Sequence, residues 1–213
     1  MREYSCIKKG HKKYFLKKYS DVKIHEIVEE YNKSLMLSHL TNYPKPIEFS
    51  TTTIMYEWIN IKYSFEELNN KGKLTNAHIK QLASMISTIH KEGVYHGDLG
   101  FRNIVIDTKN KVWLIDAGVR VDREVPSKYF DLSRIVAQLK YLKPITKPHL
   151  IFNRNNNKKV RVFLDNYNDI LDEKTLKHTT LVVYKKYRDL VLKNNNYLSY
   201  LFWFLLVKVL EEK

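Results

Sequence analysis

Asp98, Asn103 and Asp116 are the residues of this chain whose types and spacing are best suited to do chemistry. All three lie in the run VYHGDLGFRNIVIDTKNKVWLIDAG, residues 94–118. Two carboxylates and one carboxamide offer hard oxygen ligands, which suit magnesium held against nucleotide phosphates. The run therefore predicts a site for magnesium and phosphate.

A single hairpin is expected to bring these residues together. Apolar strands are predicted over Asn103–Asp107 and Lys111–Ile115, with a turn at residues 108–110 between them. Asp98 lies in the loop before the first strand, and Asp116 follows the second strand directly. The rest of the chain should position and support this site.

Length and composition indicate a globular protein. The 213 residues are 44% hydrophobic and 13% aromatic, enough for one substantial core or for two lobes that share a cleft. The single cysteine, Cys6, excludes an internal disulfide and agrees with a reducing compartment. The start has no apolar core like that of a signal peptide, and no run approaches the roughly 18 to 20 apolar residues of a spanning helix. We therefore expect a cytoplasmic protein.

The charge is strongly basic, since 37 Lys and Arg against 23 Asp and Glu give a formal net charge of +14. Such a charge favours anionic partners: nucleic acid, an acidic membrane surface or phosphorylated substrates. A lysine-rich solvated surface is an equally good explanation. We find no specific nucleic-acid motif in the sequence.

Strands over residues 4–7 and 12–19 are predicted to form a hairpin around Lys8-Lys9-Gly10. Because side chains alternate along a strand, Lys17 and Lys18 point to opposite faces, and one of them must face inward. A lysine on the buried side needs an anion, which nucleotide phosphates would supply.

A helix predicted over Lys23–Leu40 carries three glutamates, Glu26, Glu29 and Glu30. Any one of them could pair with the strand lysine and hold it towards the phosphates. The others would then belong to an ordinary solvated helix face.

Two strand-like runs, Ile47–Ser50 and Thr52–Trp58, lead to a candidate hinge at residues 54–60. An extended hinge exposes backbone groups at the back of a cleft, where the edge of adenine could pair with them. Glu57 and Ile59 are the candidates for this contact. A plain connector between a strand and a helix would look the same.

The second half of the chain is predicted to be mainly helical. The expected elements are helices at Thr75–Glu92, Tyr129–Tyr141, 158–172 and 174–193, and a loop at Lys143–Asn157. Asp131 could cap the start of its helix or brace the loop around Asp98. Residues 197–210 are apolar on nearly every side and too short to span a bilayer, so they pack in the core or contact a membrane interface.

The order of these features resembles the protein-kinase-like superfamily over essentially the whole chain. They are a lysine strand, an acidic helix, a hinge, His-Gly-Asp-x4-Asn and Ile-Asp-Ala-Gly. The resemblance implies an α+β, two-lobed fold, with a reduced N-terminal β lobe over 1–58 and a mainly helical C-terminal lobe over 59–213. It also implies a single kinase-like domain that uses ATP and Mg²⁺ to phosphorylate an alcohol group.

The resemblance assigns the nucleotide-binding roles. Lys17 would contact the α- and β-phosphates, and it is chosen over Lys18 because Tyr-Phe-Leu-Lys matches the family's Val-Ala-Ile-Lys. Glu30 would pair with Lys17. Asn103 and Asp116 would hold magnesium.

The same resemblance assigns the roles around the reacting group. Asp98 would be the catalytic base that orients the acceptor hydroxyl. The side chain of His96 would support the loop near Asp116, and Asp131 would match the aspartate that anchors the catalytic loop.

Departures from the protein-kinase pattern favour a small-molecule or specialised kinase. His-Gly-Asp replaces His-Arg-Asp, and Ala117 replaces the Phe of Asp-Phe-Gly. Asp131 follows Asp116 by only 15 positions, which leaves no room for a long activation segment and a peptide-binding platform. Gly100 stands where Ser/Thr kinases have a lysine, and Arg102 could instead neutralise the transferring phosphate.

Two families of small kinases are most similar. Lipopolysaccharide core kinases, which phosphorylate heptose or Kdo at the cytoplasmic face of the inner membrane, share FLKKY, the short interval after IDAG, and KKVRVFLDNY. They imply an anionic glycolipid or sugar acceptor and peripheral membrane contact through 197–210. The atypical kinase of the tRNA threonylcarbamoyl-adenosine complex is also compact, but its basic C-terminal tail is not seen here. We expect the sugar kinase.

The family's glycine-rich phosphate loop has no counterpart, since few residues precede the lysine strand and Gly10 is the only glycine among them. The family's first strand, which carries that loop, is therefore expected to be missing or heavily reduced in this chain. Either ATP is covered differently, or the true start lies upstream, or catalysis is impaired, as in a pseudokinase binding module. The retained Lys17, Asp98, Asn103 and Asp116 argue against the last alternative.

Overall fold

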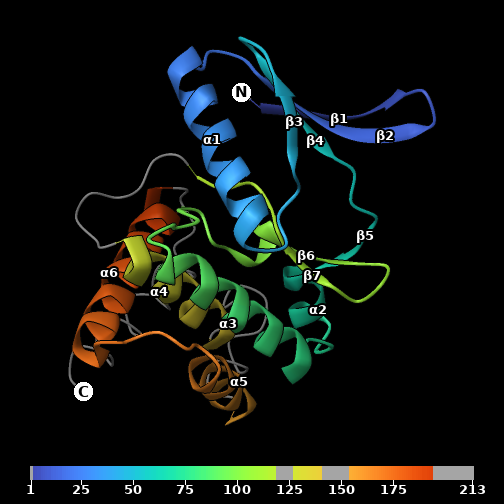
Figure 1. The fold of residues 1–213 in the computed structure, drawn as a ribbon. Helices are drawn as coiled ribbons and strands as arrows, with labels where there is room; N and C mark the ends of the chain where they lie inside the picture. The colour runs from blue at the N-terminus through green and yellow to red at the C-terminus, as the bar shows by residue number, and fades with distance from the viewer. Residues whose placement is uncertain (1, 119–126, 141–153, 194–213) are drawn as a thin grey trace.

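A computed structural model describes residues 2–118, 127–140 and 154–193, and it has the predicted α+β fold of two lobes. A small N-terminal lobe is built on one sheet and one helix. A larger, mainly helical C-terminal lobe lies beneath it (Figure 1).

One antiparallel sheet and the helix beside it form the N-terminal lobe. The elements are β1 (Arg2–Lys9), β2 (Lys12–Tyr19), α1 (Ile24–Leu40), β3 (Pro46–Phe49) and β4 (Thr53–Glu57). The strand order is β1-β2-β4-β3, and the hairpin of β1 and β2 projects away from the helices (Figure 1). Lys17 lies opposite Tyr4 on one neighbour and Ile54 on the other, so the predicted lysine strand is central in the sheet.

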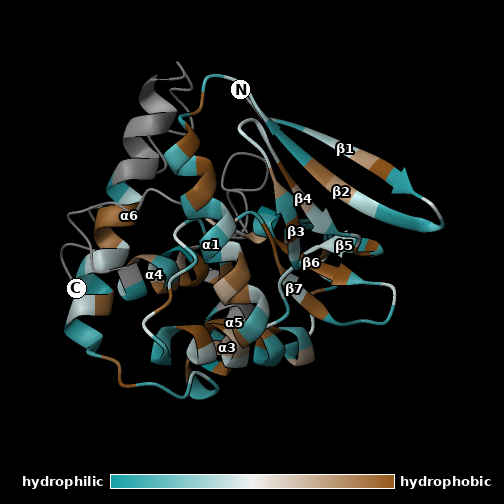
Figure 2. Ribbon diagram, turned by 45° about the horizontal axis from the view of Figure 1, so that its top comes forward, coloured by the Kyte–Doolittle hydropathy of each residue, from teal (hydrophilic) through white to brown (hydrophobic). Residues whose placement is uncertain are grey.

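The helix α1 buries one face against this sheet. Its buried side chains are Ile27, Glu30, Ser34 and Leu37, which follow helical spacing. Figure 2 shows the corresponding alternation of hydrophilic and hydrophobic segments along α1. A charged residue in that buried row requires a partner of opposite charge.

A short three-stranded sheet and five helices form the C-terminal lobe within the described ranges. The elements are β5 (Ile61–Ser64), α2 (Phe65–Asn70), α3 (Asn76–Lys91), the 3-10 turn η1 (Phe101–Asn103), β6 (Ile104–Asp107), β7 (Val112–Leu114), α4 (Ser127–Lys140), α5 (Arg154–Asp165) and α6 (Glu173–Lys193). The sheet has the order β5-β6-β7, and β6 and β7 are the predicted hairpin.

The helix α3 is the centre of this lobe. Thr75 and His78 form a reciprocal capping box at its start, and the chain turns at Gly93 after it. The apolar stripe of Ile79, Leu82, Ala83, Ile86 and Ile89 is fully buried. Its packing fixes the end of α3, from which the chain enters the stretch that holds Asp98.

One strand was missed in the sequence, and both ends of one helix were misplaced. Strand β5 was not expected, because it has only four residues and is stabilised by pairing with β6, which is distant in sequence. Helix α5 begins at Arg154, inside the predicted loop, because packing of its buried face, with Phe163 fully buried, outweighs the low helix propensity of the asparagine run. The same helix ends at Asp165 rather than 172, because turns follow at Asn166 and Tyr167.

No helix within the described ranges is long and apolar enough to cross a membrane. The segment 197–210, for which membrane contact was predicted, lies outside the described residues, as does most of the predicted loop at Lys143–Asn157.

Candidate active site

Lys17 on β2 is almost completely buried, with 2% of its surface exposed. Its Nζ lies 2.5 Å from Oε1 of Glu30 on α1 and also contacts Oδ1 of Asp116. Lys18 is exposed, as is Glu29. The geometry thus selects Lys17 and Glu30 from the alternatives that the sequence left open.

The contact of Lys17 joins both lobes. Glu30 comes from the N-terminal helix, whereas Asp116 lies two residues after the end of β7 in the C-terminal lobe. Asp116 has a φ of 56°, which side-chain-bearing residues rarely adopt, and such strain is typical of functional sites. A buried ammonium between two carboxylates is well compensated, and it can also meet the phosphates of a nucleotide.

Asp98 is held at both oxygens of its carboxylate. Oδ2 accepts hydrogen bonds from Nδ2 of Asn103 at 3.0 Å and from Nη2 of Arg102 at 3.1 Å. Oδ1 lies 2.6 Å from Nη1 of Arg134, which comes from α4. Burial raises the pKa of Asp98, but the charges of Arg134 and Arg102 and the bond from Asn103 outweigh it, so the pKa lies below its usual value. Asp98 is therefore an ionised acceptor at neutral pH.

Asn103 and Asp116 offer oxygen ligands that fit magnesium. Asn103 uses its amide nitrogen on Asp98, both on the carboxylate and on the main-chain oxygen at 2.8 Å. Its carbonyl oxygen is thereby directed elsewhere. The main chain ties Asn103 to the start of the Asp116 segment, since Ile115 N donates to Asn103 O at 2.9 Å.

The described residues contain no group of three or more His, Cys, Asp or Glu side chains that could hold a metal ion alone. Two oxygen ligands instead suit a magnesium ion that keeps water and phosphate oxygens as its remaining ligands. Asn103 and Asp116 fit that kind of site.

The loop before Asp98 is anchored by Asp131. Its carboxylate accepts hydrogen bonds from His96 N at 2.7 Å and Gly97 N at 3.0 Å. Helix α4 starts four residues earlier, at Ser127, so the interpretation of Asp131 as a helix cap is wrong and it braces the loop. The His96 ring contacts the carbonyl of Ile115 at 3.0 Å, as expected for support near Asp116. Burial lowers the pKa of His96 to about 4.

Steric constraints explain the glycine of the His-Gly-Asp motif, Gly97. Gly97 has a φ of 80°, and a Cβ there would lie 2.7 Å from the carbonyl oxygen of Gly118. A Cβ on Gly118 would in turn lie 3.1 Å from Asp98 Cβ. The two loops therefore pack backbone against backbone, which keeps Asp98 and Asp116 close together.

Glu57 and Ile59 lie at the end of β4 and on the connector to β5. Glu57 is paired with Tyr14, three positions along the strand from the partner of Lys17, a distance of about 10 Å. They are therefore not in the cluster around Lys17. The Glu57 N–H already donates to Lys45 O at 2.9 Å, so this donor is engaged and is not available to adenine.

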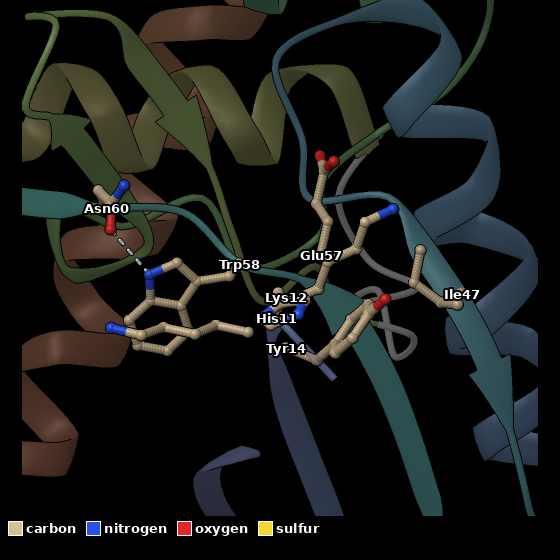
Figure 3. A pocket seen from close by; sticks show the side chains of 8 residues that line it. His11, Lys12, Tyr14, Ile47, Glu57, Trp58 and Asn60 are labelled. Atoms are coloured by element: carbon tan, nitrogen blue, oxygen red, sulfur yellow. Dashed lines mark hydrogen bonds between the residues drawn. The ribbon is translucent and has the colours of Figure 1, made fainter. Parts of the chain in front are cut away.

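A cavity of about 570 Å³ lies beside this connector rather than at the carboxylates (Figure 3). Its lining residues are His11, Lys12, Lys13, Tyr14, Ile47, Glu57, Trp58 and Asn60. Trp58 donates from its indole nitrogen to Asn60, and Lys13 lies over the Trp58 ring. This lining does not include the site residues Lys17, Asp98, Asn103 and Asp116. The cavity is therefore separate from the proposed reaction centre.

Three residues of the site were missed in the sequence. Arg134 contacts Asp98, Lys33 donates to the carbonyl of Gly118, and the hydroxyl of Tyr43 accepts from Ala117 N at 3.0 Å. Burial lowers the pKa of Lys33, against the charges of Asp131 and Glu30. Of these three residues, only Arg134 could have been found from the sequence, because it lies one turn after Asp131 on the same helix face.

This arrangement, carried on an α+β frame of two lobes, is that of a protein-kinase-like protein. The RIO domain model matches residues 3–142, and the chain belongs to this protein-kinase-like family. The match includes every site residue described above.

Similarity to individual kinases is partial. A stretch of 46 residues is 41% identical to a 3-deoxy-D-manno-octulosonic acid kinase of Xylella fastidiosa (strain M12), covering 22% of this chain and 18% of that protein. A probable serine/threonine-protein kinase KIN1 homolog of Enterocytozoon bieneusi (strain H348) is 30% identical over 114 residues, 48% of this chain and 18% of that protein. The B1 kinase of vaccinia virus (strain Western Reserve) is 27% identical over 111 residues, 44% of this chain and 35% of that kinase.

The chain thus spans well under half the length of each of these kinases. Because a fold can host several functions, activity has to be argued from the site itself.

Proposed function

We propose that the protein is a phosphotransferase that uses ATP and Mg²⁺ to phosphorylate an alcohol group. One observation supports this proposal above all: Lys17 contacts both Glu30 and Asp116, while Asp98 is bonded to Asn103. Residues from the strand, the helix and the hairpin are thereby assembled for phosphoryl transfer, which depends on positioning and on electrostatic stabilisation.

The contacts support the following roles. Asp98, ionised and accessible on one side, orients the acceptor hydroxyl and takes its proton. Lys17, held by Glu30, binds the α- and β-phosphates. Asn103 and Asp116 hold magnesium, which neutralises charge on the phosphates.

Two further assignments complete the proposed site. Arg102, whose side chain is 68% exposed beside Asp98, neutralises the transferring phosphate. The backbone of Glu57 and Ile59 pairs with the adenine edge from the connector.

We propose a sugar of the lipopolysaccharide inner core, heptose or Kdo, as the acceptor, reached at the cytoplasmic face of the membrane. The 46-residue similarity to the 3-deoxy-D-manno-octulosonic acid kinase supports this choice. The net charge of +14 suits an anionic glycolipid. The two arginines beside Asp98 would attract the same class of acceptor.

A second candidate is a small atypical Ser/Thr kinase, such as that of the tRNA threonylcarbamoyl-adenosine complex. The RIO domain match over residues 3–142 and the similarity to the serine/threonine-protein kinase homolog favour this alternative. In that case the acceptor is a partner protein.

One experiment separates these proposals. The purified full chain is incubated with labelled ATP and Mg²⁺ and, in parallel, with core glycolipid, with proteins of the tRNA-modifying complex, and with a generic protein substrate. Label on glycolipid alone supports the sugar kinase, and label on a partner protein replaces it with the atypical kinase.

Asp98→Asn should abolish transfer without unfolding the protein, while Asp165→Asn, an exposed position on α5, serves as the matched control. An Asp98→Asn variant with full activity, or a wild type that neither binds nor turns over ATP, would contradict the proposed reaction. The latter result would leave a binding module.

A further inference from the structure

One face of α4 holds the loop around Asp98 at three successive points. Asp131 accepts from the main chain of residues 96 and 97, and Arg134 contacts the carboxylate of Asp98. Gln138 accepts a hydrogen bond from Phe101 N at 2.7 Å. The spacing of three and four residues places all three side chains on the same side of the helix.

Arg134 is the contact among these three that reaches a reacting group. Nη1 lies 2.6 Å from Asp98 Oδ1, and only 16% of the Arg134 side chain is exposed. The guanidinium also lies over the ring of Phe130 at 5.5 Å. A pair this close and this sheltered from solvent is held more tightly than a surface ion pair.

The position of Arg134 also carries an energetic cost. Its Nε is buried and has no hydrogen-bond partner within the described part of the chain. An unpaired buried donor destabilises by about 1–3 kcal/mol, and native proteins keep such groups where another requirement fixes the side chain. The requirement here is the contact of Nη1 with Asp98.

Gly100 faces Arg134 and Gln138. A Cβ at residue 100 would make ordinary contacts, 3.4 Å from Nη2 of Arg134 and 3.6 Å from the amide nitrogen of Gln138. A longer side chain at this position would meet the guanidinium. The sheltered positive charge beside Asp98 comes from α4.

The second arginine on Asp98 is of a different kind. Arg102 contacts the opposite carboxylate oxygen, Oδ2, and 68% of its side chain is exposed. An exposed pair of this kind contributes about 0–1 kcal/mol and can be exchanged for another partner at little cost. Arg134 is thus the fixed contact of Asp98, and Arg102 is the exchangeable one.

We propose that Arg134 is a positioning residue for phosphoryl transfer, which fixes the Asp98 carboxylate through Oδ1 so that Oδ2 faces the acceptor hydroxyl. The inference rests on the proposed role of Asp98 as the base. Arg134 acts through Asp98 and does not bind nucleotide, so its loss should lower kcat and leave the KM for ATP unchanged.

The test compares steady-state kinetics of Arg134→Met, Arg134→Lys and a matched control with the wild type. Arg161→Met is the control, because Arg161 forms an exposed ion pair with Asp165 on α5. We expect kcat of Arg134→Met to fall on the order of 10- to 100-fold, the effect of a slightly misplaced catalytic group. Arg134→Lys should restore part of the loss, and Arg161→Met should match the wild type.

The stability of the same variants separates positioning from a merely structural tie. A thermal shift with Mg²⁺ and ATP shows whether Arg134→Met is folded, and Arg134→Lys serves if it is not. A wild-type kcat in either folded variant would overturn the inference. So would a KM for ATP that rises as much as kcat falls, because Arg134 would then contact the nucleotide.

Failure of the proposed function looks different. A wild type that transfers no phosphate to any acceptor and does not hydrolyse ATP overturns the proposed function itself. An active wild type with an indifferent Arg134 overturns the positioning role alone.

Discussion

At the scale of single residues, the site depends on two glycines whose backbones touch. The carbonyl of Gly118 occupies the space that a Cβ on Gly97 would need, and Gly97 also has a φ of 80°. Asp98 and Asp116, which flank this contact in sequence, are brought together by it. A side chain at residue 97 would therefore separate Asp98, the proposed base, from Asp116, the proposed magnesium ligand.

We expect Gly97→Ala to lower both stability and phosphoryl transfer. Gly93→Ala is the matched control, because Gly93 has a φ of 68° and nothing within 4 Å of its notional Cβ. The left-handed conformation alone destabilises alanine by about 1–2 kcal/mol, and the contact adds to this at residue 97 only. Urea unfolding and turnover would be measured for both variants. Equal losses of stability would contradict the steric explanation.

His96 gives the protein a stability that depends on pH. Burial holds its pKa at about 4 in the folded protein, whereas an unfolded histidine titrates near 6.5. As the pH falls, the unfolded chain takes up the proton first, so the free energy of unfolding decreases between about 6.5 and about 4 and changes little from this cause below that. The gap corresponds to about 3 kcal/mol.

Urea unfolding at pH 7.0 and 4.5 would test this contribution in the wild type and in His96→Gln. We expect a smaller decrease in the variant, because glutamine does not titrate. The pKa of Asp98 is depressed in the folded protein, so its effect on the free energy of unfolding appears only at a lower pH. The unfolded chain takes up that proton below about 3.9. Parallel decreases in the two proteins would show that His96 is not the group responsible.

At the scale of elements, β2 and α1 form a unit through one buried ion pair. Lys17 and Glu30 are exposed by 2% and 1%, and Asp116 meets the lysine from the other lobe. Removing one partner leaves a buried charge without its counter-ion, which typically costs about 3–5 kcal/mol, whereas removing both charges costs less.

Lys17→Met should therefore be strongly destabilised, and Lys17→Met with Glu30→Gln should recover much of the loss. Neither variant should bind nucleotide, because the lysine is absent from both. Denaturant unfolding and nucleotide titration separate the two effects. A double variant as unstable as the single one would mean that the lysine is held by contacts other than this pair.

Elements with strong local signals could be predicted from the sequence, and elements made by distant contacts could not. Helix α3 and the hairpin of β6 and β7 have regular periodicity, so both were predicted correctly. Strand β5 is four residues long and depends on β6, which lies far along the chain. In the site, alternation and spacing left Lys17 or Lys18 and three glutamates open, and the resemblance assigned Lys17 and Glu30. The contact of Arg134 with Asp98 depends on how α4 packs.

At the scale of the whole molecule, the residues proposed to bind one nucleotide come from both lobes. Lys17 and Glu30 belong to the N-terminal lobe, while Asn103 and Asp116 belong to the C-terminal lobe. A ligand that contacts both parts stabilises their arrangement as well as the site, and its binding free energy adds to the stability of the folded protein.

ATP with Mg²⁺ should raise the melting temperature, and ATP with a chelator should raise it much less. At a concentration near 100 times Kd, the stabilisation is about 2.7 kcal/mol, or roughly 5–10 °C for a protein of this size. Asp116→Asn should lose the magnesium-dependent part, because it removes a charged oxygen ligand. Asp165→Asn, on the exposed face of α5, should keep the full shift. Equal shifts with magnesium and with chelator would mean that Asn103 and Asp116 do not hold a metal, even if the nucleotide binds.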